Sequence, residues 1–226
     1  MTPGAVAALI DHTLLKPETP QTGVEQLCRE AAEFKFATVC INPTWVKLAY
    51  EQLRSTQVGV CAVVGFPFGA NTTDIKRHEA ERVILDGASE VDVVINVGAL
   101  RSGDLNLFEH DIGNVVQVCR ENDVISKVII EAALLTDEQK VVACQTAKTV
   151  GAMFVKTSTG FGLGGATVED VALMRKTVGA DIGVKAAGGV KNYDTLQAML
   201  RAGATRIGSS SGVDIVQEVV SRMHRT

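Results

Sequence analysis

The stretch Glu90-Val91-Asp92-Val93-Val94-Ile95-Asn96 decides the fold class of this 226-residue chain. It is short, apolar and rich in β-branched residues, which is typical of a buried strand. Successive side chains of a strand point to opposite faces. Val91, Val93 and Ile95 therefore share one aliphatic face, and Asp92 lies on the other. We expect helices to cover the aliphatic face.

Seven further runs of the same kind precede or follow this one, and amphipathic stretches separate them. The expected strands are Ala8–Thr13, Phe36–Asn42, Val58–Gly65, Glu90–Val97, Ile125–Glu131, Ala152–Ser158, Asp181–Ala186 and Thr205–Ser209. The expected helices include Gly23–Phe34, Thr73–Gly87, Asp137–Val150, Thr167–Val178 and Asn192–Ala202. Thr136-Asp137-Glu138-Gln139 predicts one helix start, because a polar cap precedes acidic residues in the first turn.

Repeated strand–helix units with short connections predict a parallel sheet. Eight units in a chain of this length fit a compact (β/α)8 TIM barrel with surrounding helices. The rival architecture is a doubly wound open sheet, which usually has five or six such units. No linker rich in proline or serine divides the chain, so we expect residues 1–226 to form a single domain.

Charged residues recur on the face that points into the expected barrel. The alternation that places Asp92 inward also places Lys127, Lys156 and Lys185 inward on the fifth, sixth and seventh strands. Buried charge is costly unless each ion has a partner. A barrel selected for stability alone would fill its interior with valine, isoleucine and leucine. Three inward lysines and an inward acid therefore predict an active site.

Lys156 and Lys185 are the expected catalytic pair. Lys156 lies near the end of its strand, at the catalytic rim of such a barrel, where a lone lysine would more often be a structural partner of an acid. Lys185 has the same parity on the adjacent strand. Two ammonium groups about 5 Å apart repel by roughly 3 kcal/mol at an effective dielectric near 20. Repulsion and desolvation together favour one neutral amine, which Schiff-base chemistry requires.

The other inward polar residues leave alternatives open. Asp92 is either a salt-bridge partner of a lysine or a group that relays protons, and the two roles are compatible. Lys127 either joins the same network or balances charge. Cys40 points into the barrel, where a small buried hydrophobe is the expected role rather than a chemical one.

Glycine and serine follow the last two strands, where many such barrels hold a phosphate group. Backbone N–H groups in these loops and the N-terminus of the expected final helix, Val213–Arg222, are suited to bind an anion. The predicted phosphate-binding residues are Gly188, Gly189, Gly208, Ser209 and Ser210.

The stretch Gly160-Phe161-Gly162-Leu163-Gly164-Gly165 matches the GxGxxG pattern of dinucleotide sites. That pattern requires an acidic residue about 20 positions later, and Lys185 stands there instead. We therefore interpret the stretch as a flexible loop beside a substrate phosphate.

Composition excludes several other classes of protein. The net charge is −4 and aromatic residues make up 4 % of the chain, so we expect no nucleic-acid partner and no membrane surface. The five cysteines form no CxxC pair, which suits the reducing cytoplasm. The four histidines show no HxH or HExxH spacing, so no metal-ligand set is visible.

Six motifs occur in order from about Ile10 to the last expected helix. They are Ile10-Asp11-His12-Thr13-Leu14-Leu15-Lys16-Pro17, Val39-Cys40-Ile41-Asn42-Pro43, Glu90-Val91-Asp92-Val93-Val94-Ile95-Asn96, Lys127-Val128-Ile129-Ile130-Glu131, Val155-Lys156-Thr157-Ser158-Thr159-Gly160 and Lys185-Ala186-Ala187-Gly188-Gly189. In sequence and spacing the set resembles the deoxyribose-phosphate aldolase family. The Lys-Thr-Ser-Thr-Gly run followed by the second lysine motif is its most specific part.

The resemblance implies a class I aldolase on a TIM barrel, a lyase of carbohydrate metabolism that needs no metal or other cofactor. Such an enzyme reversibly cleaves 2-deoxy-D-ribose 5-phosphate into acetaldehyde and D-glyceraldehyde 3-phosphate. Lys156 would form the Schiff base, Lys185 would favour its neutral amine, and Asp92 would transfer protons. The residues expected to bind substrate or to support the site are Thr13, Cys40, Lys127, Thr157, Thr159 and Gly160. A homodimer or a higher homo-oligomer is expected.

Two departures and two alternatives accompany this interpretation. Phe161 stands where some relatives have a lysine that meets the phosphate, so we expect backbone N–H groups rather than a cation to bind it. Ala186 stands where some relatives have proline.

Another Schiff-base sugar-phosphate enzyme, such as a transaldolase-type barrel, is the first alternative, although its sequence pattern is absent. The second is a sugar-phosphate binding protein without catalysis, which would gain nothing from a deprotonated lysine.

Overall fold

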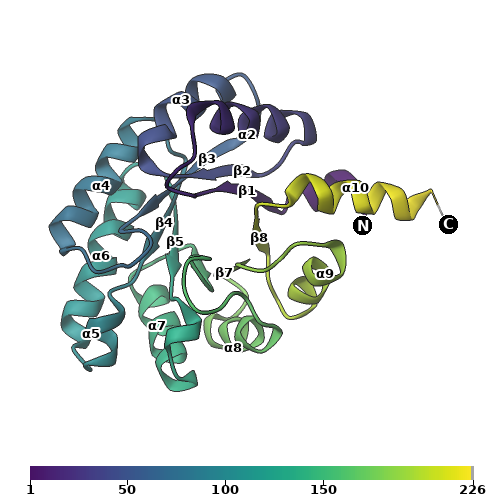
Figure 1. The fold of residues 1–226 in the computed structure, drawn as a ribbon. Coiled ribbons are helices and arrows are strands. Elements are labelled where there is room, and N and C mark those ends of the chain that lie inside the picture. Colours follow the sequence, from purple (N-terminus) through teal and green to yellow (C-terminus); the bar gives the residue numbers. More distant parts are fainter. Residues whose placement is uncertain (225–226) are drawn as a thin grey trace.

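The computed structural model describes residues 1–224, and its eight strands close a parallel barrel in chain order (Figure 1). Each expected strand overlaps one observed strand. The last strand pairs with the first, as Ile10 opposite Ile207 shows, so the open-sheet alternative is wrong. The strands are β1 (Ile10–Leu14), β2 (Thr38–Ile41), β3 (Gly59–Val64), β4 (Glu90–Val94), β5 (Ile125–Ile129), β6 (Phe154–Lys156), β7 (Gly183–Ala187) and β8 (Arg206–Ser209).

Helices form a ring around this barrel (Figure 1). They are α1 (Pro3–Ala7), α2 (Gln21–Phe34), α3 (Val46–Leu53), α4 (Thr73–Leu85), α5 (Val97–Arg101), α6 (Leu105–Glu121), α7 (Asp137–Thr149), α8 (Val168–Val178), α9 (Tyr193–Arg201) and α10 (Gly212–Met223). Two 3₁₀ turns, η1 (Pro43–Trp45) and η2 (Ala132–Leu134), follow β2 and β5. The expected start of α7 is confirmed, because Thr136 and Gln139 form a reciprocal capping box.

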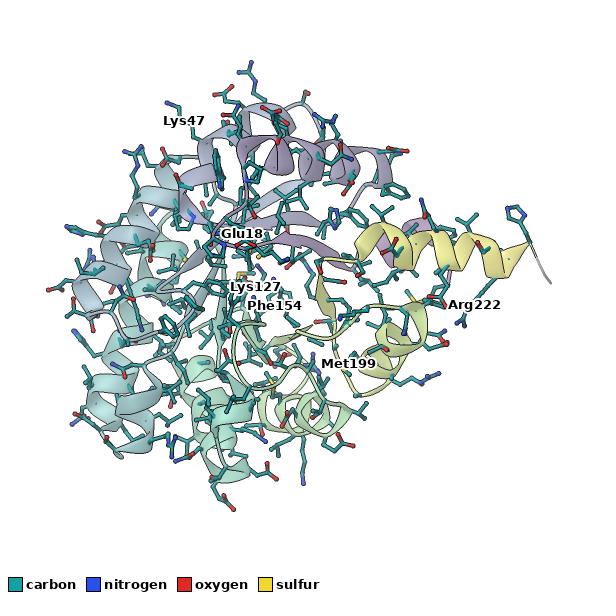
Figure 2. All side chains as sticks on the ribbon, in the orientation of Figure 1. Glu18, Lys47, Lys127, Phe154, Met199 and Arg222 are labelled. Carbon is teal, nitrogen blue, oxygen red and sulfur yellow. The ribbon has the colours of Figure 1, made fainter. Side chains whose placement is uncertain are left out.

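The alternation of side chains separates an apolar layer from a charged interior. Val91, Val93 and Ile95 belong to the main hydrophobic core, between the sheet and the helices. Figure 2 shows Lys127 and Phe154 in the middle of the barrel, whereas Lys47 and Arg222 lie on its outside. The predicted assignment of faces is therefore confirmed for β4 and β5.

The interior of the barrel has an apolar side and a charged side. A small cluster of Leu15, Cys40, Cys61 and Val63 fills the part lined by β2 and β3. Charged side chains of β1 and of β4 to β8 fill the remainder. Within residues 1–224, none of the helices combines the length and hydropathy that crossing a bilayer requires.

Candidate active site

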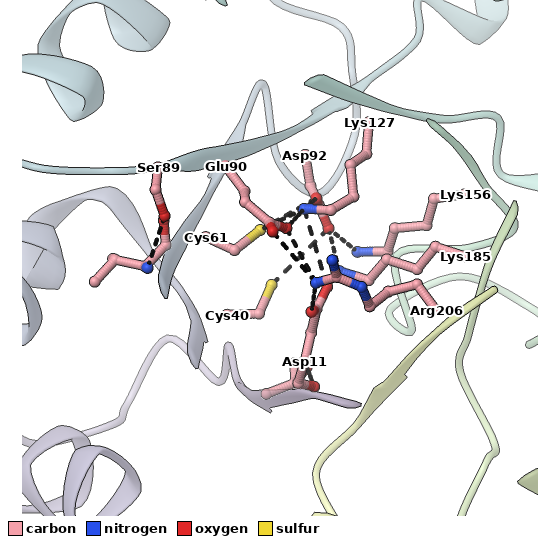
Figure 3. Close-up of polar contacts among 12 residues, drawn as sticks. Asp11, Cys40, Cys61, Ser89, Glu90, Asp92, Lys127, Lys156, Lys185 and Arg206 are labelled. Carbon is pink, nitrogen blue, oxygen red and sulfur yellow. Dashed lines mark hydrogen bonds and ion pairs between the residues drawn. The ribbon is translucent and has the colours of Figure 1, made fainter. Parts of the chain in front are cut away.

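Asp92 lies at the centre of a buried cluster of charged groups inside the barrel (Figure 3). Its Oδ1 accepts a hydrogen bond from Lys127 Nζ at 2.7 Å. Its Oδ2 accepts hydrogen bonds from Lys156 Nζ at 2.8 Å and from Lys185 Nζ at 2.7 Å. All four side chains are at most 2 % exposed. The structure therefore brings together the four inward charged residues that the alternation selected.

A second layer of charged groups lies beside the first (Figure 3). Asp11 Oδ2 lies 2.5 Å from Lys185 Nζ, and Glu90 Oε2 lies 2.6 Å from Lys127 Nζ. Arg206 Nη1 donates to Asp11 Oδ1 at 2.6 Å and to both Glu90 oxygens at 3.3 Å. Sequence reasoning assigned these three residues no role. The signal was available, because Glu90 lies two residues before Asp92 and so shares its face.

The partners in this cluster fix the charge of two central groups. Burial by itself would raise the pKa of Asp92, but Lys127, Lys156 and Lys185 outweigh burial and hold that pKa well below its usual range. Burial would lower the pKa of Lys185, but Asp11 and Asp92 outweigh burial and raise it above the usual value. Asp92 is therefore a carboxylate and Lys185 an ammonium ion near neutral pH.

Lys156 differs from the other two lysines in its partners and in its access. It is the last residue of β6, and within residues 1–224 its one carboxylate partner is the Asp92 oxygen that it shares with Lys185. Lys127 and Lys185 each contact at least two carboxylates. Of these three lysines, only Lys156 lines the cavity at the carboxyl ends of the strands. Among the three lysines, Lys156 thus has the fewest carboxylate partners and is the one that a substrate can reach.

The cavity above Lys156 has a volume of about 340 Å³. It joins the end of β1, the loop after β6 and the loops after β7 and β8, which are far apart in the sequence. Nine residues selected from the sequence line it, namely Thr13, Lys156, Thr159, Gly160, Gly188, Gly189, Gly208, Ser209 and Ser210. The catalytic and phosphate-binding candidates are therefore parts of one site.

The end of the cavity formed by the loops after β7 and β8 has the features of an anion site. Gly188 and Gly189 have φ angles of +88° and +83°, which side-chain-bearing residues rarely adopt. The Ser209 hydroxyl donates to the Val190 carbonyl at 2.6 Å, so it braces the loop. Ser210 is exposed at the cavity wall. Backbone N–H groups and the nearby start of α10 are therefore the main donors at this end.

Two exposed lysines also line this cavity, Lys16 after β1 and Lys191 after β7. Sequence reasoning had considered only position 161 for a cation and expected none here. The signal in the sequence was Lys191, which stands two residues after the glycine pair. The structure thus supplies positive charge at the same end of the cavity from other loops.

Two further candidates support the site without lining the cavity. The Thr157 hydroxyl donates to the Ala187 carbonyl at 3.0 Å and accepts from the Ala187 N–H at 3.1 Å, which ties the ends of β6 and β7 together. Cys40 is fully buried, with its Sγ 3.9 Å from Asp92 Oδ2. A hydrogen bond with Cys61 lowers the pKa of the Cys40 thiol, although burial opposes it.

Glu131 at the end of β5 holds the loop that follows Lys156. Its Oε2 accepts from the Thr159 hydroxyl at 2.5 Å and from the Thr159 N–H at 3.2 Å. The Thr159 Oγ1 in turn accepts from the Phe161 N–H at 3.1 Å. Alternation places Glu131 on the same face as Lys127, but sequence reasoning gave it no role, because its partner Thr159 lies in the loop after the next strand.

The glycine-rich stretch 160–165 lies in the loop between β6 and α8, as expected. The Ala166 N–H that follows it donates to the Gly188 carbonyl at 2.9 Å. The loop therefore lies beside Gly188, one of the residues predicted to bind phosphate.

The barrel also brings together potential metal ligands. Cys40, Cys61 and Asp92 have donor atoms within 4.8 Å of one another. Lys127 Nζ already lies 3.2 Å from Cys61 Sγ and 2.7 Å from Asp92 Oδ1. A divalent ion would meet the positive charge of Lys127 and Lys185 there, so this donor set fits a metal poorly.

Comparisons with known proteins agree on one family. The model of a family described as DeoC/LacD family aldolase matches residues 5–218. A deoxyribose-phosphate aldolase of Streptococcus gordonii is 59 % identical over 92 % of this chain and 94 % of its own length. One from a Geobacillus species is 58 % identical over 94 % and 95 %. The tetrameric deoxyribose phosphate aldolase of Aeropyrum pernix superposes with a TM-score of 0.91, at 30 % identity, over 98 % of this chain and 93 % of that chain.

Proposed function

The chain belongs to the DeoC/LacD aldolase family, and we propose that it reversibly cleaves 2-deoxy-D-ribose 5-phosphate into acetaldehyde and D-glyceraldehyde 3-phosphate. One observation carries the proposal. Lys156 lies at the wall of a cavity whose far end has the donors for a phosphate group, and it shares Asp92 Oδ2 with a second lysine. A Schiff-base enzyme for a phosphorylated aldehyde sugar needs these elements in one site.

The balance of charge supports Lys156 as the nucleophile. The barrel interior holds the cations Lys127, Lys156, Lys185 and Arg206, and the carboxylates Asp11, Glu90 and Asp92. One cation therefore lacks a counter-charge. Lys156 shares its carboxylate partner with Lys185, which supports Lys156 as the amine that attacks a carbonyl.

The chemistry follows from that amine. Lys156 Nζ adds to the C1 aldehyde of the open-chain sugar, and loss of water gives the protonated imine. Loss of the C3 hydroxyl proton and cleavage of the C2–C3 bond then release glyceraldehyde 3-phosphate, while the electron pair moves to the enamine. Protonation at C2 and hydrolysis release acetaldehyde and restore the amine.

Asp92 and Lys185 are placed to move protons in these steps. Asp92 stays ionised, so it is a weak base by itself, but its Oδ2 bridges the two amines at 2.8 and 2.7 Å. Lys185 is the nearby proton donor. Through Asp92 Oδ2, a proton of Lys185 can move towards Lys156 as charge forms and disappears there. This assigns Asp92 the relay role and Lys185 the role of charged partner.

The phosphate group would occupy the end formed by Gly188, Gly189 and Ser210. Backbone N–H groups and the start of α10 would bind its oxygens, with Lys16 and Lys191 adding charge at the rim. The long axis of the substrate would then run from this end to Lys156.

Three wider properties belong to the same proposal. We place residues 1–226 in one domain, since eight strands close one barrel, and we expect a homo-oligomer, a dimer or larger. The free state of all five cysteines suits the reducing cytoplasm. The transaldolase-type alternative is not favoured, because the matched family and the relatives named above are aldolases.

A substrate assay tests this function. The purified chain should release acetaldehyde and glyceraldehyde 3-phosphate from 2-deoxyribose 5-phosphate and should re-form the sugar from the two products. Transfer of a three-carbon ketol unit between sugar phosphates, without acetaldehyde release, would instead support the transaldolase-type alternative.

A further inference from the structure

Three cations stand in one row across the last strands of the barrel. Lys156 on β6 is in register with Lys185 on β7, and Lys185 is in register with Arg206 on β8. Residues in register on neighbouring strands point to the same face, and Figure 3 shows all three heads at the central cluster. Arg206 is therefore the third member of a row of which the proposed mechanism uses two.

Arg206 forms ion pairs with carboxylates that also pair with the lysines. Its Nη1 lies 2.6 Å from Asp11 Oδ1 and 3.3 Å from Glu90 Oε1. Asp11 is also a partner of Lys185, and Glu90 is also a partner of Lys127. A guanidinium does not lose its proton in proteins, so Arg206 contributes a fixed positive charge, whereas each lysine can release its proton.

The balance of positive and negative charge inside the barrel depends on all the charged and titratable groups that face its interior. They are Asp11, Cys40, Cys61, Glu90, Asp92, Lys127, Lys156, Lys185 and Arg206. The carboxylates number three and the potential cations four. Burial and the nearby Cys40 raise the pKa of the Cys61 thiol, so Cys61 stays neutral. Cys40 has a lowered pKa and is the one thiol that can add a negative charge near neutral pH.

We propose that Arg206 is a positioning residue for the nucleophile: its permanent charge engages Asp11 and Glu90 from the far side of the cluster, so that Lys156 is the amine left without a full counter-charge. This inference rests on the proposed Schiff-base role of Lys156. Arg206 does not contact the cavity, as none of its lining residues is Arg206. Its effect therefore passes through Asp11, Glu90 and the two lysines between.

The test is the pH dependence of borohydride trapping with acetaldehyde. Arg206→Met removes one positive charge and leaves three carboxylates for three lysines, so Lys156 should keep its proton and the midpoint of trapping should move alkaline. Glu90→Gln removes one negative charge, so the midpoint should move acidic. Each shift should be roughly one pH unit, the effect of a unit charge at about 10 Å and an effective dielectric near 20. Arg206→Lys retains the charge and should stay close to the wild-type midpoint.

Opposite shifts in the two charge variants support the inference, since a purely structural role would not reverse in sign. Repeating the series in a Cys40→Ala background should preserve both directions, which excludes titration of that thiol as their cause. Midpoints that are unchanged, or that move the same way in both variants, would overturn the role of Arg206. If Arg206→Met does not fold, Arg206→Gln removes the same charge while keeping hydrogen-bonding groups, and its midpoint compared with that of Arg206→Lys decides the matter. A wild-type chain that traps no acetaldehyde would refute the proposed function instead.

Discussion

Lys156 and Lys185 lie opposite each other on β6 and β7, and their ammonium nitrogens contact the same oxygen, Asp92 Oδ2, at 2.8 and 2.7 Å. Lys185 has a second carboxylate partner in Asp11, and Lys156 does not. The two amines therefore compete for one negative charge, and Lys185 is the better placed to hold its proton. This asymmetry is the physical basis for assigning them different roles.

Replacing Lys185 by leucine should make Lys156 a poorer nucleophile at neutral pH. Asp92 Oδ2 would then serve Lys156 alone, so the ammonium form of Lys156 would be favoured. We expect the pH midpoint of acetaldehyde trapping to move alkaline by up to about two units. Activity alone is a poor measure, because the change also disturbs Asp92. The charge-preserving control is Lys185→Arg, and a midpoint that is unshifted in Lys185→Leu would mean that burial alone tunes Lys156.

A negative charge at position 210 should weaken binding of the phosphorylated sugar. Ser210 is exposed at the cavity end that holds Gly188 and Gly189. Ser210→Asp should raise KM for 2-deoxyribose 5-phosphate and should change cleavage of unphosphorylated 2-deoxyribose little. The neutral control is Ser210→Asn. Equal losses with both sugars would place the phosphate elsewhere.

The exposed Lys191 at the same cavity gives a second, independent test of the proposed phosphate site. Lys191→Met should raise KM for the phosphorylated sugar and should leave kcat nearly unchanged, because the ammonium group is at the rim and distant from the reacting atoms. Steady-state kinetics with both sugars measure this directly. A fall in kcat with KM unchanged would contradict a binding role.

A buried ion pair outside the site should contribute to stability. Lys76 Nζ donates to Asp111 Oδ2 at 2.5 Å and to the Val94 carbonyl at 2.9 Å, and both side chains are at most 1 % exposed. Lys76→Met leaves a buried carboxylate unpaired, which should lower the free energy of unfolding by about 3 kcal/mol. The double change Lys76→Met and Asp111→Leu should recover most of that loss in urea denaturation. If the double variant is no more stable than Lys76→Met, the unpaired Asp111 carboxylate is not the cause of the loss.

Metal chelators should leave the activity intact. Of the groups that could ligate an ion, the Cys61 thiol and the Asp92 carboxylate already contact Lys127. Dialysis against EDTA should therefore not change kcat. Loss of activity that added zinc restores would contradict the Schiff-base interpretation.

The strand alternation made much of the barrel and of its centre predictable. The run that contains Asp92 identified one aliphatic and one charged face, and the same parity on three more strands selected the three lysines. Side-chain alternation is local, so a single sequence contains it. The helices α3 and α6 were not among the ranges predicted.

Contacts between residues on strands far apart in the sequence were harder to predict. Asp11 and Arg206 are 195 residues apart in the chain, and barrel closure between β1 and β8 brings them to 2.6 Å. Neither residue signals the other in the sequence. Lys16 lines the same cavity as Ser209 and Ser210 for the same reason, since β1 closes the barrel beside β8. Glu131 was given no role because its partner, Thr159, is 28 residues along the chain, in the loop after the next strand.

The most direct test of this account is to locate the trapped imine. The chain is incubated with acetaldehyde and reduced with borohydride, and its peptides are mapped by mass spectrometry. The account predicts an ethyl adduct on Lys156 that disappears in Lys156→Ala, together with all cleavage of 2-deoxyribose 5-phosphate. An adduct on Lys185 or Lys127 in the wild-type chain, or full cleavage by Lys156→Ala, would contradict it.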